Sequence, residues 1–246
     1  MKKYQVVLFV LLFYGIRASA QASDRDQSIQ NDFQNYVNAE SSRNYSGSFL
    51  PVFTNKENTV GSRYLFGRWV HGKVVNANSE QVNDDTYVFN YDKINRKLLA
   101  TQDNKTVLEI NDEDLQSFTL AYDENTVVFE RVPLINKTDF FVTSVESEKG
   151  YSLYKKLQTR FQKANFTTNG IFQSGKNYDE YVDESEYYVV FPGNKEVKKV
   201  ELTRKSLRDV FKSNMTSVRR YYTEHSGETF DENFLGGLVN FLNSRD

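Results

Sequence analysis

The chain has 246 residues, of which 39% are hydrophobic and 26% are charged, and its formal net charge at pH 7 is −2. With only 3 Pro and 12 Gly, this composition is typical of a folded protein and excludes collagen-like and wholly disordered chains. The sequence contains no cysteine, which excludes disulfides, thiol nucleophiles and thiolate metal sites.

Residues 1–20 have the features of a secretory signal peptide. Lys2 and Lys3 precede an apolar run over residues 6–16, and the sequence Ala-Ser-Ala at 18–20 supplies the small side chains that signal peptidase requires. This apolar run is too short to cross a bilayer of about 30 Å. We therefore expect cleavage before Gln21 and export to the periplasm or the extracellular space.

The charge balance of the exported chain is mildly acidic. Loss of residues 1–20 removes three basic side chains and no acidic one, which leaves 28 basic against 33 acidic side chains, a net charge of −5. Such a balance gives no electrostatic footprint for nucleic acid or anionic lipid, so we expect no nucleic-acid partner. No later stretch is apolar enough to predict a transmembrane segment.

Three regions follow the signal peptide: a polar N-terminal leader over 21–60, a β-rich domain over 61–202 and a helical segment over 203–246. In the β-rich region apolar and polar residues alternate, which predicts strands with one face on the core and one toward water. Strands recurring about every 8–12 residues between turn-forming residues predict an antiparallel meander that forms a sandwich, roll or barrel. Residues 151–164 fit a long strand and a helix equally well.

The C-terminal segment has helical spacing of its apolar residues. Two or three amphipathic helices are expected, and the last one shows apolar residues at 235, 238, 239 and 242. Thr229 and Glu232 fit a capping box at the start of that helix. We expect the helices to pack on the sheet, because the strands leave an apolar layer that needs cover. The predicted fold class is α+β, mostly β.

Known catalytic motifs are missing, so no residue is assigned as catalytic. Residues 170–177 resemble a phosphate-binding loop, but Asn177 replaces the Ser or Thr that would bind magnesium. The only histidines, His71 and His225, are far apart in the sequence and form no zinc-hydrolase motif.

A cluster of acidic residues over 179–186 offers the first candidate site. Carboxylates are the oxygen ligands that calcium prefers, so the sequence allows a calcium site there, although the spacing and Gly of a calcium loop are missing. A solvated charged loop is the alternative interpretation. The candidate metal ligands are Asp179, Asp183, Glu184 and Glu186.

Four tyrosines in or beside this acidic sequence are candidates for a partner-binding or ligand-binding surface. Exposed Tyr rings stack on sugars and are common at protein interfaces. The alternative is that these rings fill the core, as most aromatic residues in strands do. The four residues are Tyr178, Tyr181, Tyr187 and Tyr188.

Several short motifs occur in a fixed order along the chain: Gly61–Phe66, a Trp-Val-x-Gly strand at 69–72, Gly150–Lys156, Tyr178–Tyr181 and Tyr187–Val189. In this order the chain resembles an uncharacterised family of exported proteins of Bacteroidota-type Gram-negative bacteria, over most of its length after residue 60. The resemblance implies an exported, β-rich protein and carries no activity, since the motifs have the character of packing and turn positions. Arg63 stands where the family pattern has Pro.

The expected function is that of an exported, soluble, non-catalytic binding or scaffolding component of the bacterial envelope, with an envelope protein or a glycan as its partner. One alternative is an envelope hydrolase that uses a carboxylate pair. Another is a small outer-membrane barrel, although charged side chains such as Glu130 and Arg131 interrupt the faces of the expected strands.

The signal-peptide prediction has a direct test in the intact mass of the exported protein. That mass should correspond to a chain beginning at Gln21. Ala20→Arg should retain the leader, because the peptidase pocket admits only short side chains. Ser19→Leu changes the unrestricted middle position and should still be cleaved. An exported chain that keeps residues 1–20 would contradict the prediction.

Overall fold

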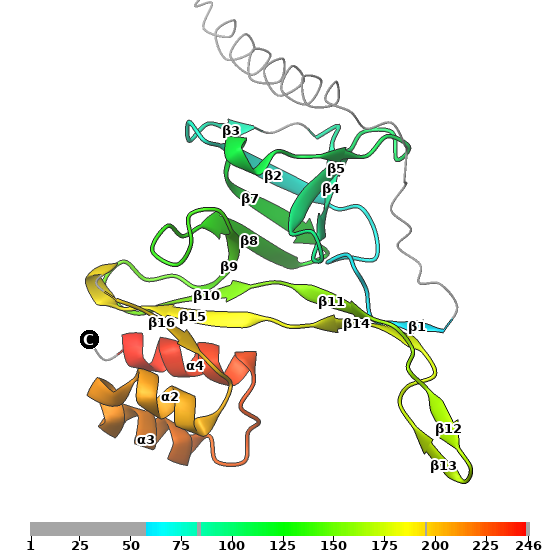
Figure 1. Ribbon diagram of the computed structural model, residues 1–246. Helices are drawn as coiled ribbons and strands as arrows, with labels where there is room; N and C mark the ends of the chain where they lie inside the picture. Colours follow the sequence, from blue (N-terminus) through cyan, green and yellow to red (C-terminus); the bar gives the residue numbers. More distant parts are fainter. Residues whose placement is uncertain (1–57, 83–84, 195, 245–246) are drawn as a thin grey trace, which may run out of the picture.

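The computed structural model describes residues 58–82, 85–194 and 196–244. Strands in mainly antiparallel sheets outnumber helices in this part of the chain, and a helical subdomain follows at its C-terminal end (Figure 1). The predicted α+β, mostly β class is therefore confirmed. The predicted signal peptide and all of the predicted leader up to residue 57 lie outside the described residues.

The largest sheet has eight strands, all antiparallel to their neighbours. Its two outermost strands do not pair with each other, so the sheet is open. In spatial order the strands are β16 (Val197–Val200), β15 (Glu186–Val190), β10 (Ser152–Lys156), β9 (Phe140–Val145), β8 (Asn125–Arg131), β7 (Leu115–Tyr122), β2 (His71–Asn76) and β3 (Gln81–Val82).

A small sheet covers the half of the large sheet that contains β2, β7 and β8. It consists of β4 (Val88–Asp92), β5 (Lys97–Thr101) and β6 (Leu108–Glu109). The core between the two sheets is built on aromatic rings: Tyr91 lies 4.6 Å from Phe129, and Phe129 lies 4.5 Å from Phe118, between ring centroids. Alternation in β7 agrees with this packing, because Phe118 and Leu120 are buried there while Thr119 between them is not.

Strand β4 differs from the simple alternation that its sequence suggests, because both of its faces are covered. The side chain of Asn90 is fully buried, donates to the carbonyls of Phe66 at 2.9 Å and Arg68 at 3.0 Å, and accepts from the Phe66 amide. Buried Asp92 pairs with Arg63 at 2.5 Å. The segment before β2 therefore lies over the face that was expected to meet water.

The helices cover the other half of the large sheet, as expected (Figure 1). They are α2 (Arg204–Val210), α3 (Met215–Glu224) and α4 (Glu232–Asn243). Leu153, Val189 and Val200 of the sheet share one buried cluster with apolar residues from all three helices. Single turns of 3-10 helix, η1 (Asp112–Asp114), η2 (Pro192–Asn194) and η3 (Lys212–Asn214), connect other elements.

The predicted capping box at the start of α4 is wrong. The capping residue is Asp231, whose carboxylate accepts from the Phe234 amide at 2.9 Å. At the other end of the helix, Asn243 accepts from the Tyr151 amide at 2.7 Å and donates to the Tyr151 carbonyl at 2.9 Å. The side-chain amide of Asn243 therefore pairs with the Tyr151 backbone as a neighbouring strand would, and it fixes the end of α4 to the beginning of β10.

Two neighbouring glycines in α4 should respond to alanine in opposite directions. A Cβ on Gly236 would meet open space, so Gly236→Ala should raise the free energy of unfolding by about 1 kcal/mol through helix propensity. A Cβ on Gly237 would overlap the hydroxyl of Tyr221, whose buried ring packs against Phe234 and Phe241. Gly237→Ala should therefore lower the same free energy by about 1–3 kcal/mol.

Urea unfolding of the two variants and of the native chain measures both effects. Equal changes in the two variants would contradict the packing of α3 on α4.

Candidate functional site

Two strands of the large sheet continue beyond its boundary and form a projecting arm. Past β10 the chain continues as β11 (Thr159–Gln162), and β14 (Asp179–Asp183) precedes β15 on the return path. Between these strands the Glu184 amide donates to the Gln158 carbonyl at 2.9 Å. The register stays constant from the Ser152–Val190 pair to the Gln162–Glu180 pair. Residues 151–164, which fit a strand or a helix by sequence, are therefore largely strand.

A small hairpin forms the far end of the arm (Figure 1). Its strands are β12 (Thr167–Asn169) and β13 (Phe172–Ser174), joined by Gly170 and Ile171. Of the two turn residues, only Gly170 has a positive φ, which is 64°. This matches a type II′ turn, whose twist suits a hairpin. The segment that resembles a phosphate-binding loop therefore lies in a hairpin, without the following helix that would face a phosphate.

One extra residue on the return strand separates the hairpin from the rest of the arm. Asn165 pairs with Lys176 through a 3.0 Å backbone hydrogen bond, whereas Gln162 pairs with Glu180. Within this bulge the carboxylate of Asp179 accepts from the Ala164 amide at 2.8 Å. The side chain thus replaces a main-chain acceptor that the bulge removes.

The root of the arm is fixed to the small sheet by a buried lysine. The Lys93 side chain is 8% exposed, and its Nζ lies 2.7 Å from Asp183 Oδ1, which also accepts from the Thr159 hydroxyl. The Thr159 amide donates to the Lys93 carbonyl at 3.2 Å. On the outer side of the arm, β1 (Thr59–Val60) pairs in parallel with β14.

The tip of the arm, defined here as residues 163–177, is exposed at every position. Ile171 is 92% exposed, Phe172 77% and Phe166 46%, so three large apolar side chains meet water. These are the features that sequence reasoning missed. The available signal was a short apolar pair, Ile171-Phe172, within an otherwise polar segment bounded by two glycines.

The four predicted tyrosines do not form one surface. Tyr178 and Tyr181 lie on the arm, where Lys176 covers the first ring and Phe161 packs against the second at 5.0 Å. Tyr187 and Tyr188 are neighbours on β15, so their side chains point to opposite faces.

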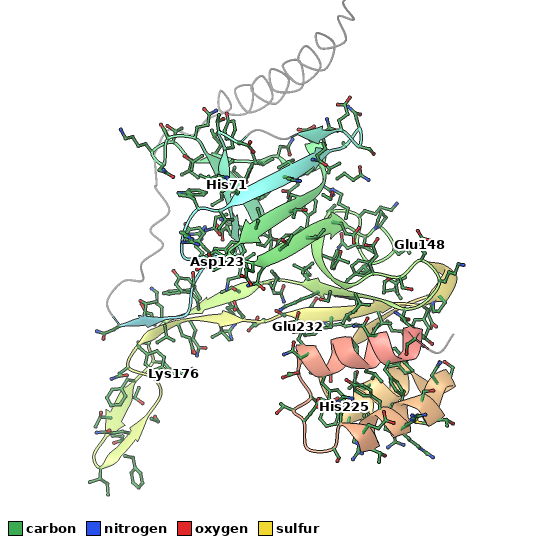
Figure 2. All side chains as sticks on the ribbon, turned by 180° about the vertical axis from the view of Figure 1, so that it is seen from behind. His71, Asp123, Glu148, Lys176, His225 and Glu232 are labelled. Atoms are coloured by element: carbon green, nitrogen blue, oxygen red, sulfur yellow. The ribbon has the colours of Figure 1, made fainter. Side chains whose placement is uncertain are left out.

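Each tyrosine of β15 packs into its own cluster. Tyr187 is buried beneath the helices and donates to Glu232 at 3.1 Å (Glu232 is labelled in Figure 2). Tyr188 packs against Phe141 on the other face of the sheet, and its hydroxyl donates to Glu186 at 2.7 Å. Partial burial and the Glu186 carboxylate raise the pKa of Tyr188 to about 12. Both tyrosines are packing residues in this fold.

The predicted acidic ligands likewise have separate partners. Asp179 bonds to Ala164 within the arm, Asp183 bonds to Thr159 and to Lys93 of the small sheet, and Glu184 pairs with Arg160 at 2.8 Å. Glu186 pairs with Lys199, and hydrogen bonds from Lys199 and Tyr188 lower the pKa of its carboxyl group. Among the described residues no group of three or more His, Cys, Asp or Glu side chains is placed to hold a metal ion, so calcium binding stays a prediction.

The two histidines lie in different parts of the molecule (Figure 2). His71 begins β2, whereas His225 follows α3, stacks on Tyr221 at 4.0 Å and lies 2.7 Å from Glu228. They therefore share no catalytic arrangement.

Comparison of the chain with protein-family models, with curated proteins and with solved structures finds no match. Within the described residues, no helix has the length and apolar character needed to cross a bilayer. The choice of the tip of the arm as the candidate site is therefore based on the structure of this chain and not on a related protein.

Gly175 controls the conformation of the tip. Its φ is +84° and a Cβ at this position would overlap the Asn165 carbonyl. Gly175→Ala should accelerate amide hydrogen exchange across residues 163–177 by about tenfold, while the global free energy of unfolding changes by less than about 1 kcal/mol, because the tip makes no core contact. Gln173→Ala, on an exposed strand position, is the matched control and should leave exchange nearly unchanged.

Exchange measured by mass spectrometry separates local opening from global unfolding. A Gly175→Ala variant that exchanges as slowly as the native chain at the tip would contradict the described turn geometry.

Proposed function

We propose that the protein is an exported, non-catalytic binding component of the bacterial envelope and that the arm is its contact element. The observation that carries this proposal is the apolar surface at the end of the arm. Ile171 and Phe172 are the two most exposed large apolar side chains among the described residues. Exposed apolar clusters on folded proteins mark interaction sites.

The way the arm is held supports a contact role. A two-stranded hairpin has little stability of its own in water. Here the arm continues the ladder of an eight-stranded sheet, and the buried Lys93 fixes its root through Asp183. Apolar side chains at the tip are thus presented on a supported element, which limits the conformational entropy lost on binding.

Core packing does not explain why apolar residues occur at the tip. Ile171 and Phe172 belong to none of the buried clusters of the described chain. Substituting them should change the free energy of unfolding by no more than about 0.5 kcal/mol. Their contribution is therefore expected in binding, where a separate assay can detect it.

Retention of the protein on washed envelopes of its own bacterium tests the proposal. The Ile171→Ser/Phe172→Ser double variant should lose most of the retained protein, because it removes the apolar surface of the tip. The matched control is Leu134→Ser, which replaces a 50% exposed apolar residue outside the arm and should be retained like the native chain. Thermal unfolding confirms that all three proteins are folded.

Equal retention of the double variant and the native chain would contradict the role of the arm. Loss of retention in both variants would assign binding to general surface hydrophobicity instead.

A further inference from the structure

Charge at the tip has one sign. Lys163 and Lys176 flank the hairpin, and no Asp or Glu occurs between residues 163 and 178. Two acidic side chains of the return strand bond to the tip from the root side: Asp179 accepts from the Ala164 amide, and Glu180 pairs with Lys176. The exported chain as a whole has a net charge of −5, so the tip is a local departure from an acidic protein.

The apolar side chains are at the apex of this basic segment. Ile171 is part of the turn itself and Phe172 follows it directly, and 92% and 77% of their respective surfaces are exposed. Phe166 lies at the other side of the hairpin, where it is 46% exposed. The apolar surface therefore protrudes beyond two lysines, and apolar side chains accompanied by lysines are typical of segments that bind at a membrane interface.

Some polar groups of the hairpin are bonded within it. Asn169 pairs with Phe172 across the turn, and the Thr167 and Ser174 hydroxyls lie 2.9 Å apart in a hydrogen bond. Below them, Asn165 Oδ1 accepts from the Lys176 amide at 2.9 Å. Internal pairing lowers the cost of bringing a polypeptide toward hydrocarbon, where water no longer supplies partners.

From these observations we propose that the tip inserts Ile171 and Phe172 into the interface of an anionic lipid bilayer, with Lys163 and Lys176 at the headgroups. The inference rests on the proposed function and names the partner of the same site. A protein pocket is the competing occupant. Lipid fits better, because Ile171 and Phe172 are almost fully exposed at the apex and the apex has no charged side chain that would fix its orientation in a pocket.

The binding is weak and reversible. Two apolar side chains bury less surface than a single myristoyl chain, which by itself gives only marginal membrane attachment. Each lysine near an anionic surface strengthens binding, and salt weakens this contribution. The arm would thus hold the protein at a membrane surface without anchoring it permanently.

Flotation of the purified exported protein with lipid vesicles tests the inference. The native chain should float with vesicles of equal parts phosphatidylglycerol and phosphatidylcholine, and less with phosphatidylcholine alone. Ile171→Ser/Phe172→Ser should reduce binding to the anionic vesicles by about tenfold or more. Lys163→Gln should reduce it by about fivefold and weaken its dependence on salt. The Leu134→Ser control should bind like the native chain.

Two results would overturn the inference: no flotation of the native chain, or equal flotation of the native chain and the double variant. Tip-dependent retention on envelopes without binding to vesicles made from the lipids of those envelopes would leave the proposed function in place and assign a protein or glycan as the partner. Loss of the tip dependence in both assays would reject both proposals.

Discussion

A single continuous strand pairing determines where the arm lies. The pairs from Ser152–Val190 to Lys156–Glu186 and those from Thr159–Asp183 to Gln162–Glu180 keep the same register. The ladder passes the end of the large sheet through the Gln158–Glu184 hydrogen bond. Because backbone pairing rather than side-chain packing extends the arm, its far end needs no core of its own. The tip can therefore present apolar side chains to water.

Both halves of the molecule support this ladder. The helices cover β10 and β15 through Leu153 and Val189, while the small sheet supplies Lys93 to the root of the arm. Bringing a lysine into a buried position is unfavourable unless it is paired, and here Asp183 provides the charge. The same carboxylate accepts from the Thr159 hydroxyl, so one side chain connects both strands of the arm to the small sheet.

Sequence reasoning recovered what local periodicity determines: the β-rich class, the antiparallel arrangement of its strands and the C-terminal helices. It missed features that depend on residues distant in the chain. Asp183 was a candidate calcium ligand, but its partner Lys93 is 90 positions away. Asn90 is buried because the segment at 66–68 covers it, which alternation cannot reveal. Tyr187 and Tyr188 were named together as binding candidates, and the structure places them on opposite faces of β15, as the period of two already implies for neighbours on a strand. Nothing in the period of two distinguishes a strand inside the sheet from one that leaves it, so the arm required the structure.

The central claim is that the tip is covered when the protein is bound to the envelope. Because the chain has no cysteine, Ile171→Cys and Leu134→Cys each introduce a single reactive thiol. The most direct measurement is the rate of maleimide labelling at each position, in the free protein and in the envelope-bound protein. We predict fast labelling at both positions in the free protein and, on binding, protection at 171 but not at 134. Equal labelling of position 171 in the free and bound states would contradict the account.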